Sequence, residues 1–265
     1  MGDNTAEDRL SRLRRREPPP LVPVEVIARD EVTPRLLRLT LEGDGIHEMH
    51  ADPAASVRLL VPSPGSTELV MPTWDGNEFL LPGGERPALR TFTPLAADRP
   101  DRLDLGIVRH VGGVVSEWAE HVAVGAPAAL SGPGRGFEWP DETTTFHLLG
   151  DETAVPAIGQ LLTVLPRAAA ITVHAEVEAQ HAIRPLPDHP DVTVEWLLRD
   201  PTAPPGARLV AAATALPEID PATHVWAAGE AASMQAIRKH LFDERELARF
   251  QATIRGYWKP ERGRR

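Results

Sequence analysis

Short runs of alternating hydrophobic and polar residues, typical of β-strands, fill the first half of the chain. They are separated by Pro, Gly and Asp, and comprise VPVEVIA (22–28), RLLRLTLEG (35–43), SVRLLVP (56–62), RLDLGIV (102–108) and APAALSGP (126–133). Strands with turn signals at this spacing are typical of a barrel or sandwich. We therefore predict an all-β domain over residues 21–140.

The pattern changes after FEWPDET (137–143), where strand-like runs begin to alternate with helical ones. The strands are TTFHLLG (144–150), AITVHAEV (170–177), VTVEWLLR (192–199) and THVWAAGE (223–230), with helices expected over 151–166, 207–216 and 231–242. Such alternation predicts βαβ units and a parallel sheet. We assign an α/β domain with a C-terminal extension to residues 141–265, and a mobile charged arm to residues 1–20.

Composition narrows the possible chemistry. The chain has no cysteine, which excludes disulfides, thiol catalysis, thiolate zinc sites and iron–sulfur clusters. No metal centre is predicted, so redox chemistry would need an organic cofactor. The net charge of -10 argues against broad nucleic-acid binding. Neither a membrane span nor a signal peptide is visible, and we expect a cytoplasmic monomer.

The stretch ALRTFTPL (88–95) has an unusual order for a strand. Alternation points Arg90 and Phe92 to one side, and Thr91 and Thr93 to the other. A guanidinium, two hydroxyls and a ring therefore gather just before Pro94, which we expect to end regular pairing. The stretch is either a sheet edge or a site for a flat, charged, hydrogen-bonding molecule.

A second candidate is the stretch VRHVGGVVSEWAEHV (108–122). A strand ends at Arg109 and His110, glycines follow at 112 and 113, and a helix is expected to begin near Ser116. Free N–H groups at a helix start bind phosphate well. An ordinary strand–turn–helix capped by Ser116 is the alternative.

Together these stretches resemble the flavin-binding pattern of the ferredoxin–NADP reductase superfamily. The order of TPRLLRLTLEG, RTFTP, IVRHVGG, LSGPGRGF, LLGDETAVPAI, VWAAGEA and GYWKPERG over residues 21–260 is similar to that of the siderophore-interacting proteins, which are FAD-dependent ferric-siderophore reductases. The resemblance implies an antiparallel six-stranded Greek-key β-barrel that binds FAD, followed by a Rossmann-like α/β domain that binds NADH or NADPH.

The resemblance also implies roles for individual residues of the barrel. Arg90 would bind the phosphate side of the flavin, Phe92 would pack on its ring, and Thr93 would hydrogen-bond near the reactive nitrogen. The implied FAD contacts are Arg90, Thr91, Phe92, Thr93, Arg109, His110, Gly112, Gly113, Val115, Ser116 and Trp118. The chain departs from the family twice: Phe92 stands where tyrosine is usual, and the glycine stretch after His110 is shorter and richer in valine.

In the α/β domain, GDETAVPA (150–157) follows the first strand and opens a helix, with Asp151 or Thr153 as its expected cap. It lacks the G-x-G-x-x-G fingerprint. The resemblance places Thr153 where nicotinamide meets flavin, and adds Asp151, Glu152, Gly229 and Glu230 to the cofactor contacts. From the residues alone, Glu230 is either a helix-dipole carboxylate or part of the nicotinamide pocket.

For the substrate, the resemblance matches Arg58 to a basic position at the pocket mouth and Lys259 to a C-terminal one. Beside Thr93, these are the candidate catalytic residues, and a ferric siderophore is the implied substrate. For Arg58 and Lys259, ordinary surface charge is the alternative. The alternative functions are a general NAD(P)H:flavin or electron-carrier reductase, and a non-catalytic siderophore- or flavin-binding protein.

Overall fold

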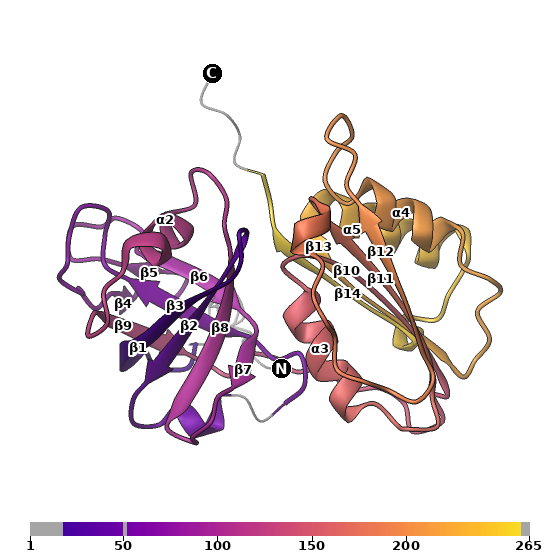
Figure 1. Ribbon diagram of the computed structural model, residues 1–265, viewed down its shortest axis with the longest axis horizontal. Coiled ribbons are helices and arrows are strands. Elements are labelled where there is room, and N and C mark those ends of the chain that lie inside the picture. Colours follow the sequence, from indigo (N-terminus) through magenta and orange to yellow (C-terminus); the bar gives the residue numbers. More distant parts are fainter. Residues whose placement is uncertain (1–17, 50–51, 261–265) are drawn as a thin grey trace, which may run out of the picture.

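The computed structural model describes residues 18–49 and 52–260 (Figure 1). Most of the arm predicted over residues 1–20 lies outside these residues. In the described part of the chain an antiparallel sheet is followed by a parallel one, and the two lie side by side. None of the helices in this part is long and apolar enough to cross a membrane.

The first sheet has seven strands in the order β6-β3-β9-β1-β2-β8-β7. The strands are β1 (Val22–Thr33), β2 (Leu36–Glu42), β3 (Val57–Val61), β6 (Ala88–Phe92), β7 (Pro94–Ala96), β8 (Arg102–Val108) and β9 (Pro127–Ser131). Helix α2 (Val114–His121) follows β8, and a separate small hairpin pairs β4 (Thr73–Trp74) with β5 (Phe79–Leu80).

Alternation along these strands builds the barrel core. In β8, Leu103, Leu105 and Ile107 are buried while the residues between them are not. They pack with the equivalent residues of β2 and β3 and with Val115 of α2. The period-2 pattern of the sequence therefore fixes which face of each strand is covered.

The barrel is not closed by hydrogen bonds, and the reason lies at Thr93. The predicted six strands become seven because the stretch 88–95 divides there into β6, which pairs with β3, and β7, which pairs with β8. Pro94 does not end the pairing as expected. Instead it is the first residue of β7, opposite Leu105. The two edge strands of the sheet are thus consecutive in the chain, and the sheet curls into a barrel-like shape.

The second sheet is parallel, in the order β12-β11-β10-β13-β14, as predicted for a Rossmann-like domain. Its strands are β10 (Thr145–Asp151), β11 (Ala170–Val177), β12 (Val192–Leu198), β13 (Thr223–Glu230) and β14 (Ala252–Trp258). Its helices are α3 (Val155–Val164), α4 (Ala207–Thr214) and α5 (Ala231–Lys239), the last continuing into a π-helical turn, His240–Glu244. Short 3-10 turns complete the structure at Ile46–Glu48, Gln180–Ala182 and Arg249–Gln251.

Helices cover both faces of this sheet and create two cores. Phe146 and Leu148 of β10 pack against α3 on one face, whereas Leu149 packs with residues of α4 and α5 on the other. Helix α3 lies on the side toward the barrel (Figure 1). There the Gln160 side chain accepts a hydrogen bond from Ala54 N, at 3.0 Å, and donates one to Pro94 O.

A buried histidine in β13 makes the stability of the second domain depend on pH. His224 is 2 % exposed, its ring lies 5.1 Å from that of Phe137, and its Nε2 lies 3.2 Å from the Thr253 hydroxyl. Burial without a partner for Nδ1 lowers its pKa from 6.5 to about 4. The imidazole is therefore neutral in the folded protein.

We expect the free energy of unfolding to fall as the pH drops from 6.5 toward 4. Over this range the His224 imidazole is protonated in the unfolded chain but remains neutral in the folded protein. The contribution of His224 is up to about 3 kcal/mol. In urea titrations between pH 7.5 and 4.5, His224→Gln should lose less stability with acidification than the wild type. His121→Gln, which removes an exposed histidine of α2, serves as the control. Equal pH slopes for His224→Gln and the wild type would contradict the assignment.

Candidate functional site at the junction of the two sheets

The predicted flavin stretch forms the open edge of the barrel. Arg90 and Thr91 are exposed, Phe92 is half-buried against the barrel core, and Thr93 is only 7 % exposed. Strand register puts Arg90 and Phe92 on one face and Thr91 on the other, opposite Arg58 of β3. The polar and aromatic groups of RTFT therefore lie on two faces of one edge.

Arg58 lies on the outward face of β3 beside the small hairpin. Its guanidinium carbon is 5.8 Å from the centre of the Phe79 ring, which makes an edge-on contact with Trp74. Lys259 is exposed immediately after β14, the edge strand of the other sheet. These two predicted substrate residues thus come from different domains.

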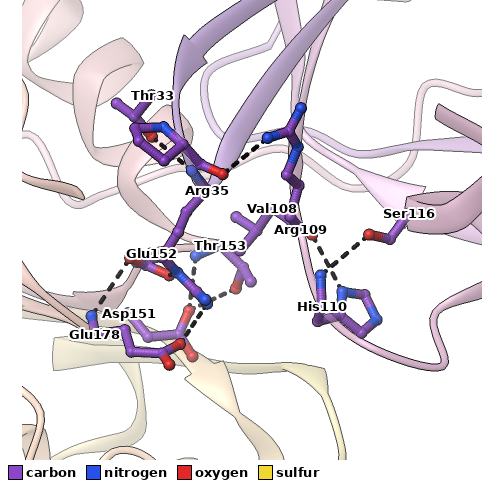
Figure 2. Close-up of polar contacts among 11 residues, drawn as sticks. Thr33, Arg35, Val108, Arg109, His110, Ser116, Asp151, Glu152, Thr153 and Glu178 are labelled. Carbon is purple, nitrogen blue, oxygen red and sulfur yellow. Dashed lines mark hydrogen bonds and ion pairs between the residues drawn. The ribbon is translucent and has the colours of Figure 1, made fainter. Parts of the chain in front are cut away.

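The loop before α2 differs in detail from the sequence prediction. The helix begins at Val114, with Gly113 at its N-cap position, so Ser116 is not the cap. Ser116 is buried instead, and its hydroxyl accepts a hydrogen bond from His110 N at 3.0 Å (Figure 2). Gly112 has φ 80°, which favours glycine. A Cβ on Gly113 would lie 2.2 Å from the His110 ring, so this glycine makes room for the histidine.

Arg109 points away from this loop (Figure 2). Its guanidinium donates to Pro34 O at 3.0 Å and lies 2.8 Å from the Glu31 carboxylate. Val115 is buried, and Trp118 packs against the barrel core. Of the predicted FAD contacts, Val115 and Trp118 therefore pack in the barrel, and Arg109 stabilises its β1–β2 turn.

At the end of β10, Asp151 collects hydrogen bonds from three segments. One carboxylate oxygen accepts from the Thr153 N–H at 2.9 Å and from its hydroxyl at 2.5 Å. The other accepts from Glu230 N at 2.9 Å and from Trp258 Nε1 at 2.7 Å. Burial raises the pKa of the Asp151 carboxyl, and these four donors oppose the shift. Asp151 thereby ties together the ends of β10, β13 and β14.

The predicted helix caps need correction. Helix α3 has Ala154 at its N-cap position and no side-chain cap, so neither Asp151 nor Thr153 caps it. Glu230 is the cap of α5, because its carboxylate accepts from Ser233 N at 2.8 Å. Of the two interpretations of Glu230, the structure thus favours the helix-dipole carboxylate. Gly229, with φ 155°, leaves the space that the Asp151 carboxylate fills.

Glu152 joins the two domains. Its carboxylate lies 3.1 Å from Arg35 Nε and also accepts from the Glu178 N–H at 3.3 Å (Figure 2). The pairing of Arg35 with Glu152 could not be predicted from the sequence, because the two residues lie 117 positions apart.

Tyr257 is partly buried near the end of β14. Burial raises the pKa of its phenol, and Arg255 and the Thr93 hydroxyl lie close enough to oppose this shift. Arg255 itself donates to the carbonyls of Ala54, Arg135 and Gly136. The end of β14 therefore lies directly against the flavin stretch of the barrel.

Comparisons with known proteins decide the family. The family model of the siderophore-interacting FAD-binding domain matches residues 25–137, and that of the siderophore-interacting protein matches residues 143–261. The chain belongs to the siderophore-interacting protein family. Its barrel is accordingly a FAD-binding domain of this family.

Individual relatives agree with this assignment. The ferric vibriobactin reductase ViuB of Vibrio cholerae is 30% identical over 248 residues, which cover 89% of this chain and 88% of ViuB. The NADPH-dependent ferric-chelate reductase of Escherichia coli is 28% identical over 152 residues, 55% of this chain and 58% of that protein. A siderophore utilization protein from T. fusca has a similar structure, with a TM-score of 0.80 at 29% identity over 94% of this chain and 96% of that one.

The residues at the barrel edge fit a bound FAD in part. The exposed Arg90 guanidinium bonds only the neighbouring Leu89 O among the described residues, so it is available to a phosphate. The first N–H groups of α2 have no acceptor within the helix. The Gly112 N–H, however, is bonded to the Glu117 carboxylate at 3.1 Å, which places a negative charge where a pyrophosphate would bind.

A groove of about 440 Å³ lies over β12. Its floor is apolar, with Val192, Val194 and Trp196, and its wall is the segment 183–188. None of the predicted site residues lines it.

The hydrogen bonds of Asp151 predict a large effect of removing its charge. Asparagine keeps one acceptor oxygen, so Asp151→Asn leaves two of the four donors facing an NH₂ group. We expect a loss of about 2–5 kcal/mol in the free energy of unfolding, measured in urea. Asp141→Asn, at an exposed position in the segment before β10, is the matched control. If both variants lose the same small amount, Asp151 does not hold the three strand ends.

Proposed function

We propose that the protein is an NAD(P)H-dependent ferric-siderophore reductase that uses FAD. The observation that carries the proposal is the family match of a FAD-binding barrel whose open edge contacts the second domain through Pro94 and Gln160. The names of ViuB and of the E. coli relative, both reductases of ferric chelates, support it. Bound FAD would supply the conversion of a two-electron hydride into single-electron transfers.

The barrel residues would bind and orient FAD. Arg90 would form a charge-assisted hydrogen bond to the phosphates, and Phe92 would offer its half-buried ring to the flavin. Thr93 would present its hydroxyl near the reactive nitrogen, where Tyr257 now lies beside it. The α2 N–H groups would receive the pyrophosphate.

The nicotinamide dinucleotide would bind at the carboxyl ends of the parallel strands. Carboxylates already occupy two of the helix starts there. Glu230 caps α5, and Glu176 accepts from Gly206 N and Arg208 N at the start of α4. Helix α3 has no side-chain cap, but its first turn is buried and includes Pro156, which has no N–H. Thr153, in the turn before α3, would then lie next to the nicotinamide.

The ferric siderophore would bind at the surface beside the flavin. A chelated iron needs no protein ligand, and the chain would contribute positive charge through Arg58 and Lys259. The aromatic pair Trp74 and Phe79 extends the surface next to Arg58. A siderophore that carries negative charge would be drawn by both cations.

The two halves of this reaction can be tested separately. Under anaerobic conditions, mixing the FAD-loaded protein with NADH or NADPH should bleach the flavin absorbance, and a ferric siderophore should then restore it. Arg58→Ala with Lys259→Ala should slow only the second step with an anionic chelate at low salt, because exposed charges are screened over about 8–10 Å at 0.1–0.15 M. A neutral chelate is the internal control.

Each outcome has a clear meaning. Bleaching without reoxidation by any ferric siderophore would favour a general flavin or electron-carrier reductase. An absence of bleaching with both nicotinamides would favour a binding protein. Thr93→Val should retain FAD but slow the bleaching, and an unchanged rate would show that this hydroxyl faces elsewhere.

The flavin site predicts two substitutions with opposite effects on FAD affinity. Arg90→Ala should weaken binding, because a charge-assisted phosphate contact contributes roughly 1.5–3 kcal/mol. Glu117→Gln should strengthen binding by about 0.3–1 kcal/mol, because it removes a negative charge from the helix start. Both changes in FAD affinity can be measured by equilibrium dialysis of the apoprotein against FAD. Glu120→Gln, one turn further along α2, is the matched control and should bind as the wild type does.

A further inference from the structure

The β1–β2 turn of the barrel reaches across to the parallel sheet through one side chain. Arg35 Nε lies 3.1 Å from the Glu152 carboxylate. The terminal nitrogen Nη2 of Arg35 lies 2.5 Å from the Glu178 carboxylate. The side chains of Arg35 and Glu152 are 26% and 15% exposed. A single guanidinium therefore bridges two carboxylates that follow adjacent parallel strands (Figure 2).

The turn that carries Arg35 is held from the barrel side. The Thr33 hydroxyl accepts from Arg35 N at 3.2 Å, and Arg35 O accepts from Arg109 N at 2.7 Å. The Arg109 side chain fixes the same turn at Pro34 O. Arg109 is followed directly by the loop that precedes α2, so the turn is anchored to the proposed pyrophosphate site.

On the other side, the Glu152 carboxylate is held by a further contact, whereas that of Glu178 is 46% exposed. Glu152 accepts from Glu178 N and stands between Asp151 and Thr153, whose positions the Asp151 hydrogen bonds fix. The cavity around Arg35 and Glu152 has room for about one water, with a volume of about 10 Å³. The contact is thus a polar, partly exposed link between two separately packed cores.

We propose that Arg35 is a positioning residue, which sets the separation between the flavin edge of the barrel and the nicotinamide end of the parallel sheet. This inference rests on the proposed function. Hydride transfer needs reacting atoms about 3–3.5 Å apart, and a misplacement of about 1 Å costs on the order of 100-fold in rate. Arg35 connects the loop before α2 to the turn before α3, and so fixes this distance without touching either cofactor.

The test compares Arg35→Met with Arg38→Met in FAD-loaded protein. Arg38 is a matched control on the same hairpin, because it also faces two carboxylates, Asp30 and Asp104, but both belong to the barrel. Flavin reduction is followed by stopped flow over a range of NADH and NADPH concentrations. Reoxidation by ferricyanide, which needs no nicotinamide, is measured on the same samples.

We expect the limiting rate of flavin reduction to fall roughly 10- to 100-fold in Arg35→Met. The half-saturating nicotinamide concentration and the ferricyanide rate should stay within about twofold of the wild type, since only the transition state depends on the alignment. Arg35→Lys should recover part of the rate, because an ammonium is a point charge that cannot bridge both carboxylates as the planar guanidinium does. Arg38→Met should match the wild type throughout.

The inference would be overturned if Arg35→Met had the same limiting rate of flavin reduction as Arg38→Met. It would also be overturned if Arg35→Met slowed flavin reduction and reoxidation by ferricyanide to the same extent. If Arg35→Met does not fold, Glu178→Gln removes one arm of the bridge from an exposed position, and it should lower the limiting rate selectively. An unchanged rate in Glu178→Gln would then count against the bridge. Failure of the wild type to accept electrons from either nicotinamide is a separate result, since it refutes the proposed function itself.

Discussion

The arrangement of the two domains depends on the change of strand partner at Thr93. β6 pairs with β3 up to Phe92, and from Pro94 onward the chain pairs with β8 at the opposite edge of the sheet. The barrel therefore remains open between its two edge strands, β6 and β7, and RTFT lies along this opening. The same opening carries the contacts to the second domain, through Thr93 to Tyr257 and through Pro94 O to Gln160. The second domain therefore covers this edge at Thr93 and Pro94, whereas Arg90 and Thr91 remain exposed.

The second domain uses buried carboxylates where many nucleotide-binding domains use glycines. Asp151 gathers three strand ends, Glu230 caps α5, and Glu176 satisfies the start of α4. Burying a carboxylate is costly unless donors surround it, and each of these accepts at least one backbone N–H. Their combined effect is to leave one helix start, that of α3, without a side-chain acceptor.

Several residues that match the family pattern turn out to serve packing. Arg109 holds the β1–β2 turn, and Ser116 holds the backbone of His110. Both contacts hold the backbone on either side of the segment that leads from β8 into α2. Arg35 lies in the motif TPRLLRLTLEG, to which the sequence assigned only a strand, yet its side chain forms ion pairs with Glu152 and Glu178 of the second domain.

The sequence by itself determined the order of the elements and the two kinds of sheet. Period-2 alternation and the switch to strand–helix alternation are local patterns, and the chain folds locally as they predict. Motif order along the chain was enough to identify the family. The sequence also singled out the four-residue stretch that forms the open barrel edge, because its mixture of polar and aromatic groups suited neither a core nor a plain surface.

Only the tertiary structure decided which polar groups find partners inside the protein. Whether Glu230 caps a helix or faces a ligand depends on the position of Ser233 N, and the role of Glu152 depends on Arg35, which is 117 residues away in the chain. The division of one strand at Thr93 likewise depends on tertiary pairing, because β3 pairs with the residues before Thr93 and β8 with those after it. Hydrogen bonds and ion pairs act only over a few ångströms. The pattern of residues along the sequence therefore does not show which distant residues become partners when the chain folds.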